Sequence, residues 1–275
     1  MLSFTDLARE QEFAVAAVTC RDDHTAWSAP EVRDCHSIVL VRRGRFRRRV
    51  GNRVADVDPT LAYLGLPGEE ERFAHPDGGD TCTWLSLTPP LWQQFGGPER
   101  LASPTVYVDA RFDLLHRRLL LAAAGGDIGY AVTEELTGLL HAALRRAGSA
   151  TEFGSVADRA LVEAAREAIA TGHPASAGLL PLAHHLGTSP YRLSRAFSRT
   201  LGASVTRYRN RVRVGWALDR LEQGTESLGQ LAAELGFADQ AHLTRTMRQH
   251  LGETPAAVKR HLSFLQSRTI STDRP

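Results

Sequence analysis

Cysteine and histidine residues recur in the first third of the chain at spacings that a metal ion could use. Cys20 and His24 are four positions apart, and His75 and Cys82 flank a Pro-Asp-Gly-Gly turn that would bring its ends together. Thiolates and imidazoles are the ligands of tetrahedral zinc, so these four residues form a candidate zinc set. Cys35 is a competing ligand. Two other interpretations stay open: buried apolar thiols on strands, or a redox-active thiol pair.

Catalytic chemistry is not expected from the remaining residues. The sequence has no His-x-His strand motif accompanied by a further Glu and His, no nucleophile elbow and no glycine-rich phosphate loop. His24, His36 and His75 are isolated from one another in the chain. We therefore predict that the protein is not an enzyme and that zinc is its one candidate cofactor.

The composition excludes several classes of protein. The chain has 275 residues, of which 43% are hydrophobic and 23% charged, as in a globular protein of two ordinary domains. No stretch approaches the roughly 20 apolar residues of a membrane helix, and the N-terminus does not resemble a signal peptide. Three cysteines are too few for a disulfide scaffold. We expect a cytoplasmic protein with no membrane partner.

Charge is distributed unevenly along the chain. Residues 156–275 contain 16 basic and 10 acidic residues, a net formal charge of +6, whereas residues 1–155 contain 17 basic and 21 acidic residues, a net of −4. A basic C-terminal part favours a polyanionic partner for that end of the molecule. The acidic run over 69–71 is expected to be solvated, and the arginines between positions 42 and 49 to meet acidic groups or solvent.

The pattern of elements changes once along the chain. Strand-length runs separated by Gly, Pro, Asn and Asp occupy about 13–88, which indicates an antiparallel meander, sandwich or barrel. Helical periodicity follows over about 110–147, then a small polar linker, GSATEFGS, over 148–155, and then helix to the end. Strands followed by helices predict an α+β protein of separate domains, 1–150 and 151–265.

An internal repeat dominates the helical part. The pattern LAxxLG at 182–187 recurs at 231–236, and LxRxF at 193–197 has the counterpart LxRxM at 243–247, each followed by a glycine at 202 or 252. Each copy is typical of a short helix, a Gly-containing turn and a second helix. The sequence therefore predicts two helix-turn-helix units, over about 179–200 and 227–250, joined by a helix over 204–223 that carries Trp216 as a core anchor.

Helical spacing divides the second helix of each copy into an inner and an outer face. Leucine and the residue four positions later face inward, which leaves polar side chains suited to bases and phosphates on the outside. These candidate DNA-binding residues are Tyr191, Arg192, Ser194, Arg195 and Arg199 in the first copy, and Gln240, His242, Thr244, Arg245 and Arg248 in the second. The connecting helix adds candidate phosphate contacts at Arg207, Arg209, Arg211, Arg213 and Arg220. Two such helices would enter the duplex about 34 Å apart.

Residues 156–262 resemble the DNA-binding domain of AraC/XylS-type transcription regulators. The most specific stretch is GFADQAHLTRTMRQHLGETP at 236–255, and LGTSPYRLSRAF at 186–197 matches as well. The resemblance implies seven helices, adds Ala241 to the reading positions, and implies a sequence-specific regulator, an activator rather than a repressor, with double-stranded DNA and RNA polymerase as partners.

The resemblance also implies a role for the N-terminal domain. In this family it is often a cupin-like β-barrel or sandwich, here with flanking helices, that senses a signal or mediates dimerisation. A small-molecule effector and a second copy of the chain are then candidate partners. The helices over 110–124 and 128–147 are a candidate dimerisation surface or pack on the barrel. The alternative is that Cys20, His24, His75 and Cys82 make this domain a zinc or thiol-redox site.

Overall fold

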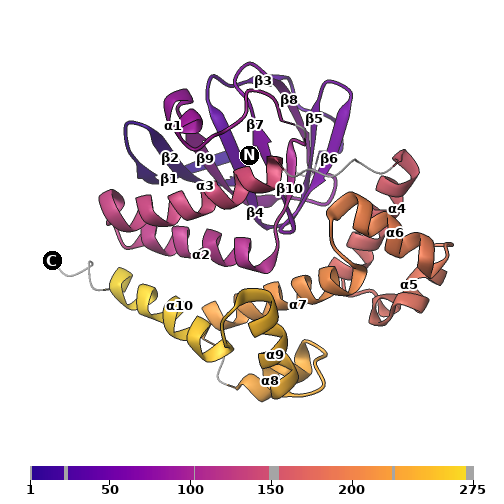
Figure 1. Cartoon of the computed structure of the whole chain (residues 1–275). Helices are drawn as coiled ribbons and strands as arrows, with labels where there is room; N and C mark the ends of the chain where they lie inside the picture. Colours follow the sequence, from indigo (N-terminus) through magenta and orange to yellow (C-terminus); the bar gives the residue numbers. More distant parts are fainter. Residues whose placement is uncertain (1, 22–23, 102, 149–154, 225–226, 271–275) are drawn as a thin grey trace. The chain divides into compact units, whose positions relative to one another are not determined.

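The computed structural model describes residues 2–21, 24–101, 103–148, 155–224 and 227–270, with side chains up to residue 262 (Figure 1). The chain divides into two compact units, whose main segments are residues 1–149 and residues 150–263. Within the described ranges, no helix has both the length and the apolar character needed to cross a membrane.

The first unit is built around two antiparallel sheets. The larger sheet has the order β1 (Leu2–Arg9), β2 (Phe13–Cys20), β9 (Asp80–Leu87), β4 (His36–Arg43), β7 (Leu61–Gly65) and β10 (Thr105–Tyr107). The smaller sheet has the order β3 (Glu31–Val32), β8 (Glu70–Ala74), β5 (Phe46–Val50) and β6 (Arg53–Val57). Strand formation thus extends on both sides of the predicted range, to β1 before it and β10 after it.

Strand β4 shows how the sequence places this sheet inside the unit. Ile38 and Leu40 belong to the hydrophobic core that also contains the helices, whereas Val39 and Val41 belong to the core between the two sheets. Successive side chains of a strand point to opposite faces, so a strand buried on both faces is apolar throughout. The unit therefore has three layers: helices, the six-stranded sheet and the four-stranded sheet.

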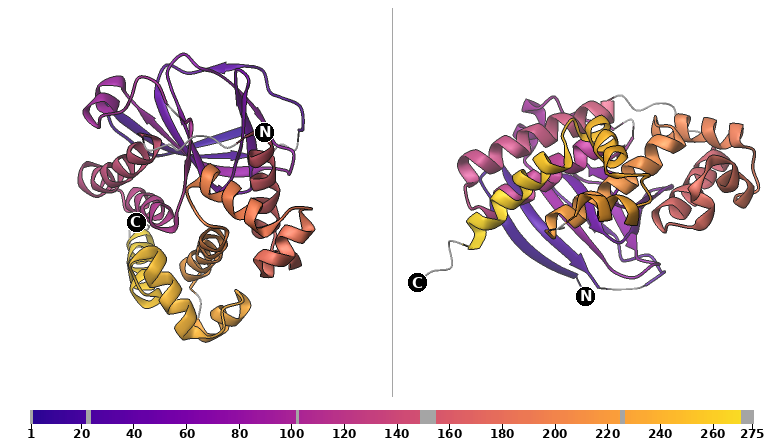
Figure 2. Two further views of the ribbon diagram at one scale, coloured as in Figure 1. Left: turned by 45° about the vertical axis from the view of Figure 1, so that its right-hand side comes forward. Right: turned by 90° about the horizontal axis from the view of Figure 1, so that it is seen from below.

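Two long helices form the outer layer of this unit. They are α2 (Ala110–Ala124) and α3 (Thr133–Gly148), joined by a π-helical turn over Ile128–Val132, and a short α1 (Pro89–Gln94) precedes them. They lie side by side against the larger sheet (Figure 1, Figure 2). Leu119, Leu139 and Leu140 are buried in the shared core. The apolar faces of these helices are therefore packed on the sheet, as one of the two interpretations of this segment predicted.

Buried ion pairs correct the expectation for the acidic run. Glu71 is only 2% exposed, and its carboxylate accepts a hydrogen bond of 2.8 Å from Nε of Arg48, which is 3% exposed. Nη2 of Arg48 also donates a hydrogen bond of 3.1 Å to Oε2 of Glu69. Solvation of the whole run was therefore the wrong expectation, because Arg48 on β5 neutralises Glu71 inside the sandwich. Other arginines of this hairpin meet carboxylates as expected, Arg47 pairing with Asp56 at 3.3 Å.

The second unit is helical. Its helices are α4 (Val156–Ala170), α5 (Leu179–His185), α6 (Pro190–Leu201), α7 (Val205–Glu222), α8 (Leu228–Glu234), α9 (Gln240–Leu251) and α10 (Pro255–Ile270), with a 3-10 turn over Pro174–Ala177. The predicted fold class is confirmed: an α+β chain with a β-rich N-terminal sandwich, flanking helices and an all-α C-terminal part.

Candidate nucleic-acid interface

Helices α6 and α9 begin at the side-chain caps that their sequences supply. The Ser189 hydroxyl accepts a hydrogen bond from the backbone N–H of Arg192 at 3.2 Å, and Pro190 occupies the first turn of α6. In the second copy the Asp239 carboxylate accepts from the backbone N–H of His242 at 2.6 Å. These contacts satisfy backbone donors that have no partner inside the helix, so the first residue of each helix is fixed.

A glycine makes each of the two tight turns. Gly187 has φ +62° after α5, and Gly236 has φ +70° after α8. Side-chain-bearing residues rarely adopt this left-handed conformation, so glycine is favoured at both positions. The two turns therefore redirect the chain in the same way, from a short first helix into the longer second helix.

The two helix-turn-helix motifs bury equivalent positions. Leu193 and Phe197 of α6 are fully buried, as are Leu243 and Met247 of α9, fifty residues further along the chain. In the first helices, Leu182 and Leu231 are likewise buried. Equivalent residues therefore form equivalent cores, and the sequence repeat is a structural repeat.

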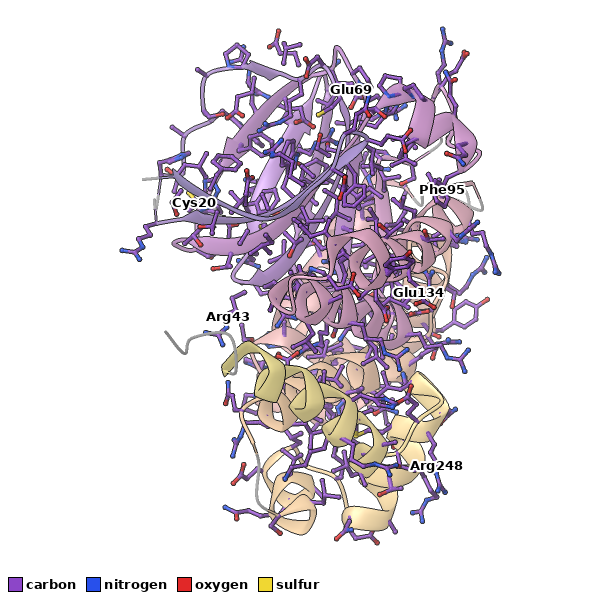
Figure 3. All side chains as sticks on the ribbon, turned by 90° about the vertical axis from the view of Figure 1, so that its left-hand side faces the viewer. Cys20, Arg43, Glu69, Phe95, Glu134 and Arg248 are labelled. Atoms are coloured by element: carbon purple, nitrogen blue, oxygen red, sulfur yellow. The ribbon has the colours of Figure 1, made fainter. Side chains whose placement is uncertain are left out.

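On both α6 and α9, the side chains predicted to contact DNA lie on the face away from the buried residues. Each is exposed or half-buried: Tyr191, Arg192, Ser194, Arg195 and Arg199 on α6, and Gln240, Ala241, His242, Thr244, Arg245 and Arg248 on α9. Figure 3 shows Arg248 at the outer margin of the helical unit. Ser198 and Gln249 are also exposed, and they were not predicted although their helical spacing places them beside the predicted residues.

Two of these side chains make contacts within their own unit. Nη1 of Arg195 donates a hydrogen bond of 2.9 Å to the hydroxyl of Tyr191, and its guanidinium lies 5.4 Å from the centre of that ring. Nδ1 of His242 accepts from the backbone N–H of Ala238 at 3.3 Å, and its ring packs against Phe237. Arg195 is thus held in an exposed orientation by Tyr191, whereas His242 braces the second turn.

Helix α7 connects the two helix-turn-helix motifs and contacts both α6 and α9. Arg213 carries one of these connections: its Nε donates to the carbonyl of Leu235 at 2.8 Å, and its guanidinium lies 3.7 Å from the ring centre of Phe237. Burial, together with the positive charge of Arg209, lowers the pKa of Arg213 to about 10, which leaves the guanidinium charged at neutral pH. A charged side chain therefore holds the second turn to the connecting helix.

Two of the predicted phosphate contacts on α7 are wrong. Arg211 and Arg213 are 2% and 5% exposed and cannot reach a phosphate group from inside the unit. Arg220 is exposed, but it forms an ion pair with Glu234 of α8 at 2.9 Å. Helical periodicity did not reveal this, because α7 is buried on most of its circumference and arginine can bury its long aliphatic stem against apolar neighbours. Trp216 is half-buried rather than a full core anchor.

The predicted cysteine and histidine set lies in the first unit and is only partly brought together. Ligand atoms of Cys20, His75 and Asp80 lie within 4.8 Å of one another. Cys82 donates from Sγ to Oδ2 of Asp80 at 2.8 Å, whereas Nδ1 of His24 is 2.8 Å from the carbonyl oxygen of Ala26. Asp80 was missed, because only the strand register places it beside Cys20.

These residues line a cavity of about 250 Å³ inside the sandwich, whose wall also contains Phe46, Tyr63 and Trp84. Figure 3 shows Cys20 in this β-rich unit. Burial, reinforced by the carboxylate of Asp80, raises the pKa of both Cys20 and Cys82. Neither thiol has the lowered pKa that makes a cysteine reactive toward oxidants, so this geometry does not favour the thiol-redox interpretation.

Comparison with known proteins identifies one part of the chain. Residues 182–261 match the family described as helix-turn-helix domain. No curated protein sequence matches the chain. The match begins inside α5 and ends inside α10, so it contains most of α5 and all of α6, α7, α8 and α9.

Solved structures similar to the chain include two of ToxT from Vibrio cholerae. The apo form is 11% identical, covers 93% of this chain and 99% of that one, and has a TM-score of 0.40. The form bound to an unsaturated fatty acid is 10% identical, covers 93% and 97%, and has a TM-score of 0.39. A cupin superfamily protein from Desulfitobacterium hafniense is 12% identical over 32% of this chain and 78% of that one, with a TM-score of 0.29.

Proposed function

We propose that the protein is a DNA-binding transcription regulator of the AraC type that reads its operator with both α6 and α9, because residues 182–261 match a helix-turn-helix domain and contain both helices. The observation that supports this most strongly is the shared burial pattern of the two helices. Each helix hides the same apolar positions and exposes arginine at the same position, Arg195 or Arg245. A repeat that retains both its core and its outward charge supports two equivalent insertions into DNA.

The exposed residues divide by chemistry into two roles. Arginine can bind guanine through two hydrogen bonds and glutamine can do the same with adenine, so Arg192, Arg195, Gln240 and Arg245 suit base edges. Arg199 and Arg248 lie near the ends of their helices and suit phosphates, which position a protein without reading sequence. The formal charge of +6 over residues 156–275 would attract the protein to the phosphate backbone of any DNA, whatever its base sequence.

The first unit is proposed to receive the signal. Its cavity of about 250 Å³ has an aromatic wall and several polar groups, the combination found in sites for small ligands. Ligand binding would bias the state of the regulator. We further propose that the regulator activates transcription in the cytoplasm, through RNA polymerase.

Salt-dependent binding to duplex DNA tests the proposal. The affinity of the full chain for a fluorescent duplex would be measured by anisotropy at several salt concentrations. The slope of log K against log salt should become shallower by about one for each phosphate that a variant no longer neutralises. Arg195→Ala and Arg245→Ala should each weaken binding to a selected operator about 10-fold or more, since a good arginine–base pairing contributes about 1–3 kcal/mol.

The matched control is Arg53→Ala on β6. Arg53 is exposed and carries the same charge, but it belongs to the first unit. Its substitution should leave both the affinity and the slope unchanged. If Arg53→Ala weakens binding as much as Arg195→Ala and Arg245→Ala do, general charge rather than two reading helices explains the affinity. If neither reading-helix variant has an effect, the assignment of α6 and α9 is wrong.

A further inference from the structure

Three different metal-binding groups meet at one end of the cavity in the first unit. Sγ of Cys20, a ring nitrogen of His75 and a carboxylate oxygen of Asp80 all lie within 4.8 Å of one another. Their residues are 5%, 9% and 6% exposed. Ligands of a tetrahedral zinc ion are about 3.3–3.8 Å apart, given bond lengths of about 2.0–2.3 Å. Shifts of about 1 Å in the positions of the ligand atoms would therefore let all three groups bind one ion.

Strand pairing explains why these residues meet. Cys20 at the end of β2 is directly opposite Asp80 at the start of β9, and opposed residues of an antiparallel pair share a face of the sheet. Gly79 allows this approach, because a Cβ atom there would lie 2.2 Å from the carbonyl oxygen of Cys20. The backbone N–H of His75 donates to the carbonyl of His24 at 2.9 Å, which fixes the turn that carries the imidazole.

The cluster leaves polar atoms without satisfied hydrogen bonds. Nδ1 of His75 and Oδ1 of Asp80 are buried and have no hydrogen-bond partner, although Nε2 of His75 is 3.0 Å from Oδ1 in an unaligned ion-pair contact. Buried polar atoms without hydrogen bonds are rare and call for an explanation such as an ion. Asp80 therefore already faces His75 through Oδ1 and Cys82 through Oδ2, whereas Nδ1 of His75 is a buried ligand atom with no hydrogen bond of its own.

We propose that Cys20, His75 and Asp80 bind one divalent zinc-type ion in the wall of the cavity. A thiolate, an imidazole and a carboxylate form a mixed sulfur, nitrogen and oxygen set suited to Zn²⁺. The thiolate and the carboxylate would together neutralise the two charges of the ion, as a buried site requires. Three protein ligands would leave a fourth position facing the cavity, as in zinc sites that bind water or a further ligand.

Cys82 has a supporting place in this site. Its Sγ donates to Oδ2 of Asp80, the oxygen that the His75 contact does not use. Groups that orient a ligating carboxylate in this way tune metal affinity about 10–100-fold. Cys20 and Cys82 are diagonal neighbours on paired strands, whose Cα atoms are about 7–8 Å apart. That separation exceeds the usual span of a disulfide, so the geometry favours a metal over a disulfide switch.

Cobalt titration of the full chain tests the site directly. The protein, freed of metal by a chelator and kept reduced, should bind one equivalent of Co²⁺. The complex should show the visible bands of tetrahedral Co²⁺ and a near-ultraviolet charge-transfer band from one thiolate. Absence of that band at saturating Co²⁺ overturns the proposal, whether or not any variant folds. Uptake of less than about a tenth of an equivalent would mean that His75 and Asp80 form only a buried ion pair.

Variants then identify the ligands. Cys20→Ser should abolish the charge-transfer band, Asp80→Asn should weaken Co²⁺ binding at least 10-fold, and Cys82→Ala, which removes the donor to Asp80, should keep the band while weakening affinity about 10–100-fold. Cys35→Ser is the matched control, because Cys35 is the third cysteine and lies outside the cluster. An equal loss in Cys35→Ser, or an unchanged band in Cys20→Ser, contradicts the assignment.

Thermal unfolding gives an independent readout. Zn²⁺ at a hundredfold excess over its Kd should raise the unfolding midpoint of the first unit by roughly 5–10 °C, since binding to the folded state alone stabilises it. Cys20→Ser should remove this shift. The test is separable from DNA binding, because Arg195→Ala should lower DNA affinity and leave Co²⁺ binding unchanged.

Discussion

At the scale of single residues, two arginines near the second turn differ in what surrounds them. Arg213 is buried and donates to the carbonyl of Leu235, whereas Arg220 forms an exposed ion pair with Glu234. We expect Arg213→Ala to lower the free energy of unfolding by about 1–3 kcal/mol, because it removes a charged donor from the partly buried carbonyl of Leu235. Arg220→Ala should cost about 0–1 kcal/mol. Urea unfolding of both variants measures the difference, and equal losses would contradict this account of Arg213.

We expect buried His116 to make the first unit less stable in acid. It is 2% exposed and forms a 2.7 Å hydrogen bond with Oγ1 of Thr83. Burial, with the positive charge of Arg42, lowers its pKa to about 3 in the folded protein, against 6.5 for a free histidine. Below pH 6.5 the unfolded chain binds the proton and the folded chain does not. Stability should therefore fall by up to about 1.4 kcal/mol per pH unit between pH 6.5 and 3.

A substitution isolates this contribution. His116→Gln keeps a polar nitrogen near Thr83 but cannot titrate, so its unfolding free energy should fall less steeply between pH 6.5 and 4 than that of the native chain. His141→Gln on α3 removes an exposed histidine and serves as the control. Calorimetric unfolding across this range gives both slopes. Parallel slopes for the native chain and His116→Gln would show that other groups cause the acid sensitivity.

At the scale of elements, the reading helices depend on their first turns. Asp239→Ala should destabilise the helical unit, residues 150–263, by about 0.5–2 kcal/mol, because the backbone N–H of His242 loses its acceptor. Asp239→Ser keeps an acceptor and should restore most of the loss. The unfolding midpoint and the affinity for DNA should change together. A DNA affinity that falls equally in both variants would indicate that Asp239 acts through its charge instead.

The elements also show what sequence can and cannot predict. The repeat was visible because buried leucines and turn glycines must recur when a motif is duplicated, and both are short-range features. The burial of Arg213 was not visible, because it depends on packing against Phe237 from outside its own helix. Asp80 escaped for a similar reason: its proximity to Cys20 follows from the register of β2 and β9, sixty residues apart.

At the scale of the whole molecule, α7 contacts both α6 and α9 and so would fix the distance between the two proposed recognition helices. We expect the operator to contain two half-sites about one duplex turn apart, 10–10.5 base pairs. Insertion of five base pairs between them rotates one half-site by about half a turn and should reduce affinity to that of a single half-site. Gel-shift titrations with the two operators measure this. Unchanged affinity would mean that only one helix reads bases.

The repeat has a final consequence for how the protein meets DNA. The inner residues of α6 and α9 correspond, but the exposed ones differ, since Tyr191 and Arg192 are replaced by Ala241 and His242. If both helices contact bases as proposed, a single chain should recognise two different half-sites in a fixed order, and its preferred site should lack two-fold symmetry. Reversing the site on a promoter would turn the bound protein end for end. An asymmetric site would therefore set both the position and the orientation of the bound protein. The orientation of the site would then decide which neighbouring gene the protein can regulate.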